Sequence, residues 1–126
     1  MSAIDAAEVI IDLLQRGHAV EFRVRGDSMH PTIREDDVVH VEPVSQVAAG
    51  DVVLVHAPRG LTAHRVVSID GGAVITRGDN APEDDDPVPV SRVLGRVEWV
   101  VRRGRKRGVG KPWWSVLRRL SGATGS

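Results

Sequence analysis

The chain has 126 residues, of which 41% are hydrophobic, 3% aromatic and 27% charged, and its formal net charge is zero. This length fits one domain with a single core of mainly aliphatic side chains, and the hydrophobic content excludes a disordered chain. The lack of cysteine excludes disulfides and thiolate metal sites. The sequence has no run of about 18 apolar residues, so no membrane-spanning helix is predicted.

The zero net charge hides an asymmetry along the sequence. Residues 1–91 contain 7 Lys+Arg and 16 Asp+Glu, whereas residues 92–126 contain 10 and 1. Such a basic C-terminal part is suited to a phosphate surface, to an acidic partner, or to the acidic body of the same chain.

Residues 3–16 are predicted to form an amphipathic helix that ends at Gly17. Its apolar side chains form one stripe, which predicts that the helix packs on the domain. Acidic residues stand where a secretory signal would carry positive charge, so this segment is interpreted as mature structure and a cytoplasmic location is expected.

After the helix, the hydrophobic period changes to two. Gly, Pro, Asp and Asn separate short runs rich in β-branched residues. We expect mainly β structure, a compact, coiled antiparallel β-domain, from the runs at 19–25, 37–43, 51–57, 62–69, 73–77 and 93–102.

The chain is therefore divided into a single β-domain, residues 1–101, and a basic linker and tail, residues 102–126. The tail is predicted to form a short helix in which Trp113 and Trp114 lie among basic residues. Such a helix suits peripheral contact with a membrane, but docking on the body or on a second subunit is an equal alternative. No folded motif that reads nucleic acid accompanies the charges, so no specific nucleic acid is expected.

The stretch "RGDSMHPTI" presents one small hydroxyl, Ser28, after an alternating strand. The residues around it are turn formers, so a simple tight turn is one interpretation, and a nucleophile is the other. A serine nucleophile needs a base. Both lysines, Lys106 and Lys111, follow the predicted β-domain, so the candidate bases are the five histidines, His18, His30, His40, His56 and His64.

Five ordered segments carry a resemblance, namely "GDSMHPTIREDDVVHVEPV", "AAGDVVLVH", "AHRVVSI", "TRGDNAPEDDDPV" and "VLGRV". From about Val20 to Val97 the chain resembles the serine peptidase superfamily of signal peptidases and SOS-response repressors. It is most similar to the endoplasmic-reticulum and archaeal type of signal peptidase, in which a His in an "HRV" motif replaces the lysine base.

This resemblance implies that Ser28 is the nucleophile and that His64 is the base that accepts its proton. Asp85, or its neighbours Asp84 and Asp86, would orient the imidazole. His56, in a neighbouring strand, is the main competitor of His64.

The resemblance also assigns residues around the reacting atoms. Asp79 and Asn80 would shape the loop at the site, and Met29 would line the substrate pocket. Gly26 stands where signal peptidases often have a Ser or Thr that helps to bind the oxyanion. The backbone N–H groups of Ser28 and Met29 would then supply the oxyanion hole.

The predicted function is that of a serine endopeptidase, signal-peptidase-like but without membrane anchors. It would cleave an extended protein or peptide segment held beside an edge strand, without a metal or other cofactor. The acidic run at 83–86 lacks the residue spacing of a calcium-binding loop, and the carboxylates that do not assist His64 are interpreted as a solvated loop. The alternatives are an inactive peptidase-fold module that binds or regulates, and self-cleavage.

Overall fold

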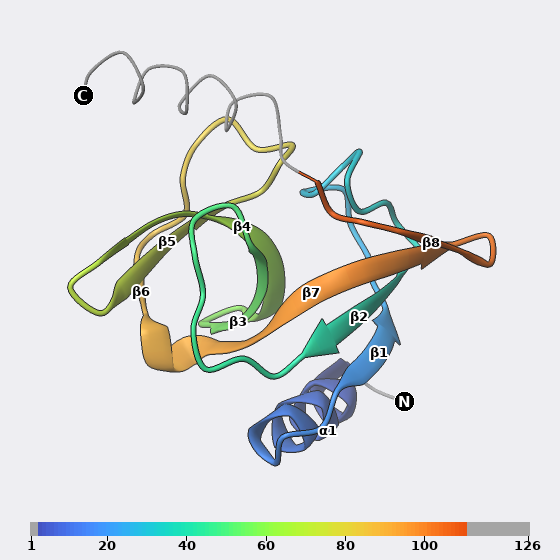
Figure 1. The fold of residues 1–126 in the computed structure, drawn as a ribbon, viewed down its shortest axis with the longest axis horizontal. Coiled ribbons are helices and arrows are strands. Elements are labelled where there is room, and N and C mark those ends of the chain that lie inside the picture. The colour runs from blue at the N-terminus through green and yellow to red at the C-terminus, as the bar shows by residue number, and fades with distance from the viewer. Residues whose placement is uncertain (1–2, 111–126) are drawn as a thin grey trace.

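The computed structural model describes residues 3–110, which form one helix and a curled antiparallel sheet (Figure 1). This confirms the predicted mainly β fold. The elements are α1 (Ala3–Gln15), β1 (Val20–Arg23), β2 (Val38–Glu42), β3 (Val52–Ala57), β4 (Gly60–Asp70), β5 (Ala73–Arg77), β6 (Val88–Pro89), a 3₁₀ turn η1 (Val90–Arg92), β7 (Val93–Arg102) and β8 (Arg105–Arg107).

The helix α1 ends as its sequence predicts. Gly17 has a φ of 86°, and its N–H donates to the Leu14 carbonyl at 3.0 Å. The N–H of His18 donates to the Leu13 carbonyl at 2.9 Å. This pair of bonds is a Schellman motif, which satisfies carbonyls at the helix end and favours glycine at the left-handed position. Leu14 is buried in the core and fixes the helix on the sheet.

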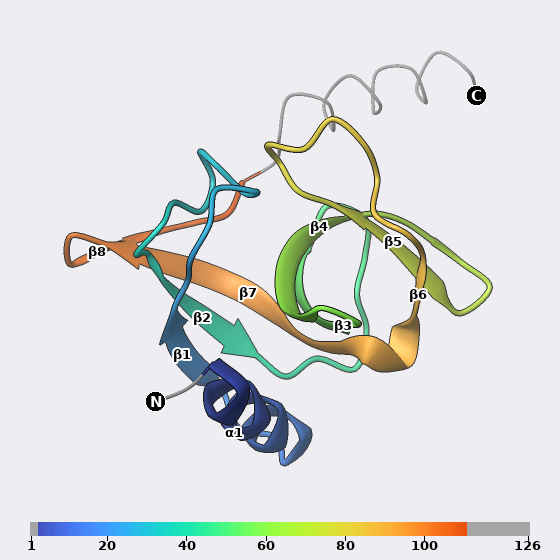
Figure 2. The same cartoon turned by 180° about the vertical axis from the view of Figure 1, so that it is seen from behind.

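The strand β7 joins the two halves of the sheet, whose order is β1-β2-β7-β3-β4-β5-β6. One edge of β7 pairs with β2, while the other edge pairs first with β3 and then with β8. Figures 1 and 2 show β1, β2 and β8 gathered towards one end of β7 and β3 to β6 at the other. The β3 strand has both faces buried, because Val52 and Leu54 pack in one apolar cluster and Val53 and Val55 in another.

The long strand β4 leaves one stretch of edge unpaired within the described residues. Its first part pairs with β3 from Gly60 to Arg65, and its second part pairs with β5 only from Arg65 onward. Residues 60–64 therefore have a strand on one side only. The strand β1, at the end of the sheet order, likewise has one free edge.

The prediction that a linker begins at residue 102 is wrong for its first part. Arg102 ends β7, and β8 pairs back on it through a two-residue turn at Arg103 and Gly104, whose φ values are 52° and 77°. Positive φ at both positions is the type I′ geometry of tight hairpins. All three β8 side chains are exposed and basic, so no alternation of apolar residues marked this strand. The predicted C-terminal helix, with Trp113 and Trp114, lies outside the described residues.

Within residues 3–110, no helix combines the length and apolar character needed to cross a membrane.

Candidate active site

Ser28 lies in the loop that follows β1, and local geometry presents its side chain to solvent. Gly26 has a φ of 93°, a conformation that favours glycine, and turns the chain after the strand. Met29 and Ile33 on either side of the next turn are buried in the core, and the Ile33 N–H donates to the Met29 carbonyl at 3.0 Å. The loop is therefore anchored while Ser28 itself stays exposed.

Three predicted residues meet in one hydrogen-bonded chain. His64 Nε2 lies 3.0 Å from Ser28 Oγ, and His64 Nδ1 lies 2.5 Å from Asp85 Oδ2. Only 9% of His64, on β4, is exposed, so its ring has little freedom to leave this position. With a proton on Nδ1, the imidazole donates to Asp85 and accepts the Ser28 hydroxyl proton at Nε2.

Asp85 is held by a residue that the sequence analysis did not select. The Thr76 hydroxyl, on β5, donates to Asp85 Oδ2 at 2.7 Å, and the Asp85 N–H donates to the Thr76 carbonyl at 2.8 Å. The alternatives Asp84 and Asp86 are exposed and make no hydrogen bond to His64. Asp85 is thus the member of the acidic run that lies at the histidine.

The loop after β5 packs directly on Ser28. The Asn80 N–H donates to the Ser28 carbonyl at 2.9 Å, and Asn80 Nδ2 donates to the Asp27 carbonyl at 3.1 Å. A Cβ atom at Gly78 would lie 2.5 Å from the Ser28 carbonyl oxygen and 3.2 Å from His64 Nε2. Only glycine allows this loop to approach the Ser28–His64 pair so closely.

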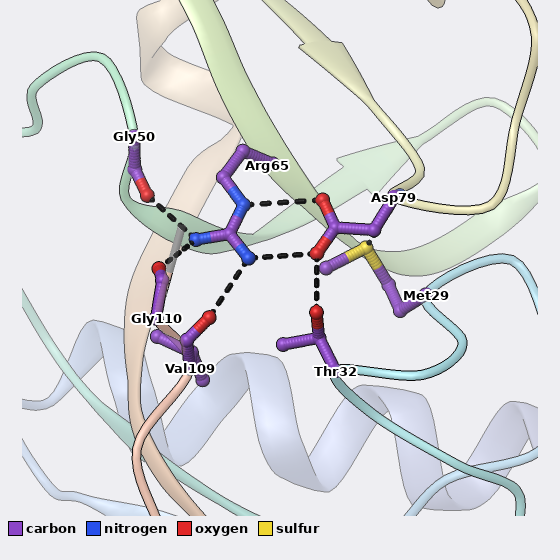
Figure 3. A network of polar contacts seen from close by, with 7 residues as sticks. All are labelled: Met29, Thr32, Gly50, Arg65, Asp79, Val109 and Gly110. Carbon is purple, nitrogen blue, oxygen red and sulfur yellow. Dashed lines mark hydrogen bonds and ion pairs between the residues drawn. The ribbon is translucent and has the colours of Figure 1, made fainter. Parts of the chain in front are cut away.

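Next to His64 in the sequence, the fully buried Arg65 forms the centre of a second network (Figure 3). Its Nε and Nη2 donate to the two carboxylate oxygens of Asp79 at 3.1 and 2.7 Å. Its other N–H groups donate to the carbonyls of Gly50 (3.0 Å), Gly110 (2.5 Å) and Val109 (2.8 Å). All five guanidinium donors are therefore satisfied, as a buried arginine requires.

Asp79, the partner of Arg65, connects this network to the Ser28 loop. Its Oδ2 accepts the Thr32 hydroxyl at 2.6 Å, and its N–H donates to the Met29 sulfur at 3.3 Å. Asp79 and Asn80 thus both lie in a loop that contacts the segment around Ser28. Arg65 was missed as a site residue, although a guanidinium inside an apolar strand is itself a signal, because it needs buried acceptors.

A groove of about 690 Å³ opens beside Ser28. Its walls are α1, the chain from Phe22 to Gly26, and the start of β4, and Met29 lies among its lining residues. Gly26 and Met29 both border the groove, although most of the Met29 side chain is in the core.

The remaining histidines do not join this constellation. His40 bonds Glu21 and Glu42 and stacks on Trp99, with ring centroids 3.8 Å apart. His18, His30 and His56 make no side-chain hydrogen bond to Ser28 among the described residues. Within residues 3–110, no group of three or more His, Asp or Glu side chains is arranged to hold a metal ion.

Comparison with known proteins identifies a family for the chain. The family model described as Peptidase S24-like matches residues 2–98, which include all three residues of the Ser28–His64–Asp85 chain. No curated protein matches the sequence significantly.

Proposed function

Because the chain belongs to the peptidase S24-like family, we propose that it is a serine endopeptidase with Ser28 as its nucleophile. The observation that carries this proposal is the continuous Ser28–His64–Asp85 hydrogen-bonded chain, whose serine lines a groove. The pairing of one ring nitrogen with a serine hydroxyl and of the other with a carboxylate is the arrangement that a general base for serine requires.

In the proposed reaction, His64 Nε2 takes the proton of Ser28 as Oγ attacks the carbonyl carbon of the scissile peptide bond. Asp85 stabilises the imidazolium that forms and keeps its orientation. The imidazolium then gives the proton to the leaving amine, and the C–N bond breaks to leave an acyl-enzyme. Water, deprotonated by the same histidine, hydrolyses the ester and restores Ser28.

The oxyanion would be stabilised by backbone donors. Neither the Ser28 nor the Met29 N–H has a hydrogen-bond acceptor among the described residues, so both remain available. Gly26 supplies no hydroxyl for this purpose. Preorganised backbone N–H groups are effective at this task because they need no reorganisation during the reaction.

The substrate we propose is an extended segment of a protein or peptide, cleaved in the manner of a signal peptidase. Residues 22–23 of β1 and residues 60–63 of β4 line the groove, and each of these strand segments has one edge without a partner strand in the described part of the chain. An extended chain placed there can make main-chain hydrogen bonds to either edge, which is the usual way that peptides add to a sheet.

A second candidate function is an inactive binding module on the same fold. Gly26 favours it, because the hydroxyl that often assists the oxyanion in signal peptidases has no counterpart there. The hydrogen-bonded Ser28, His64 and Asp85 favour catalysis, since binding alone does not require a hydroxyl, a base and a carboxylate in one chain.

The test compares wild-type protein with Ser28→Ala, His64→Ala and Asp85→Asn on a randomised peptide library analysed by mass spectrometry. We expect cleavage by wild type, none by the first two variants and a strongly reduced rate with the third. Circular dichroism spectra identical to wild type would exclude unfolding as the cause. Cleavage that persists in Ser28→Ala would refute the proposed nucleophile.

A further inference from the structure

The groove beside Ser28 is positively charged, although the body around it is acidic. Its charged lining residues are Arg23, Arg25 and Arg59, and no acidic side chain lines it among the described residues. Residues 1–91 contain only seven basic residues against sixteen acidic ones. Three of those seven therefore gather at one groove, which makes it complementary to negative charge.

Two of these arginines have no partner within the described part of the chain. Arg23 donates to the Asp36 carbonyl at 3.1 Å, whereas Arg25 and Arg59 make no hydrogen bond or ion pair with any described residue. Both are exposed, and the groove is also lined by more buried apolar side chains, including Phe22, Leu54 and Leu61. The groove thus combines an apolar floor with unpaired guanidinium groups at its rim.

The positions of the two arginines set the distance at which they would contact a bound peptide. Arg59 lies in the turn between β3 and β4, five residues before His64. At about 3.3 Å per residue, the chain from His64 to Arg59 spans roughly 16 Å, the length of about five residues of an extended peptide. Arg25 precedes Ser28 by three residues and lies closer to the scissile bond.

We propose that this groove selects extended segments that carry an acidic side chain four to five residues from the scissile bond, where Arg59 binds it, with apolar side chains on the groove floor. The proposal rests on the proposed peptidase function of the same site. Arg25 adds a preference for negative charge nearer the scissile bond. Arginine suits this role because its planar guanidinium binds a carboxylate through two parallel hydrogen bonds.

The expected effect is a change in specificity and not in chemistry. Replacing the acid of a good substrate by lysine lowers kcat/KM about ten-fold, the scale of one partly solvated hydrogen-bonded ion pair. The variant Arg59→Glu reverses this order, so that the lysine peptide becomes the better substrate. Arg92→Glu changes the net charge equally but lies outside the groove, and it leaves the order unchanged.

The experiment has a cleavage arm and a binding arm. Wild type, Arg59→Glu and Arg92→Glu are compared on randomised peptides by mass spectrometry, and the best sequence is resynthesised with glutamate, glutamine or lysine at the acidic position. In the binding arm, fluorescent peptide pools that are randomised except for one fixed glutamate, glutamine or lysine are titrated by anisotropy against the Ser28→Ala protein, alone and combined with Arg59→Glu. This arm therefore does not depend on a cleaved sequence.

The outcomes separate the two proposals. Cleavage with an acidic preference that Arg59→Glu reverses supports both. Cleavage without an acidic preference, or with one that Arg59→Glu does not change, overturns the selectivity and leaves the peptidase. Acid-dependent binding without any cleavage supports the selectivity and overturns the peptidase, and neither binding nor cleavage overturns both.

Discussion

Shortening the chain from its C-terminal side measures how much the site depends on residues 109 and 110. Their two carbonyls accept two of the five N–H groups of Arg65, a side chain with no exposed surface. Removing them leaves two buried, charged donors without acceptors, at a cost of about 1–3 kcal/mol each, or about 2–6 kcal/mol together. Since a small domain has only about 5–15 kcal/mol of stability, this loss should be large.

The assay is urea unfolding of two shortened chains, residues 1–108 and residues 1–112. The longer one keeps both carbonyls as ordinary amides. We expect a free energy of unfolding for the shorter chain that is lower by about 2–6 kcal/mol. Val109→Ala in the longer chain serves as a control, because Val109 also packs on the core and its side-chain contribution must be subtracted.

A double-mutant cycle assigns the loss to the guanidinium. When Arg65 and Asp79 are replaced together by Met and Leu, the shortening no longer removes acceptors from a guanidinium, so it should then cost less than about 1 kcal/mol. Equal costs in both backgrounds, or less than about 0.5 kcal/mol in the natural one, would refute the reasoning. Such a result would mean that water satisfies Arg65 as well as the two carbonyls do.

Four further predictions follow from single residues. Thr76→Val should lower kcat about ten-fold and change the pH profile with little change in KM, because it removes the hydroxyl that donates to the Asp85 carboxylate, while Thr76→Ser keeps a hydroxyl and restores both. Gly78→Ala should abolish peptide cleavage, since its Cβ would lie 2.5 Å from the Ser28 carbonyl oxygen; crystallography of the variant would show the displaced loop, and full activity would contradict the prediction. Burial alone would raise the pKa of Asp37, but its hydrogen bonds to Arg102 and to the Arg34 N–H lower it below 3.8 overall. The stabilisation that ionised Asp37 gives is therefore present above pH 3.8 and lost as the pH falls through the lower folded-state pKa. Asp37→Asn should reduce this loss of unfolding free energy at acidic pH, measured by urea unfolding at a series of pH values. Burial lowers the pKa of His40, but Glu42 and Glu21 raise it above 6.5 overall. The stabilisation that protonated His40 gives is therefore present below pH 6.5 and should be lost as the pH rises through the folded-state pKa. His40→Gln should remove this pH dependence of the free energy of unfolding.

The fold could be predicted wherever burial on one side of a strand imposes a pattern. The alternation in Val38–Glu42 and Ala73–Arg77 matches strands whose successive residues are partly and fully buried. Gly17 marked the helix end because the Schellman turn needs a left-handed residue. The strand Arg105–Arg107 was not predicted because a strand whose side chains are all exposed is specified by its turn and its pairing, and neither leaves an apolar pattern.

The site shows a similar limit. Motif order alone selected Ser28 and His64, but it could not choose among three consecutive aspartates, because they share the same chemistry and the same local context. The choice is made by β5, on which Thr76 offers both a carbonyl and a hydroxyl to Asp85 and to neither neighbour. The position of Thr76 depends in turn on the register between β4 and β5, which shifts between Val66 and Ser68 just after the site. The identity of the acidic residue at His64 is therefore a property of strand pairing, and a one-residue change of register in this hairpin would present Thr76 to the opposite face of the sheet.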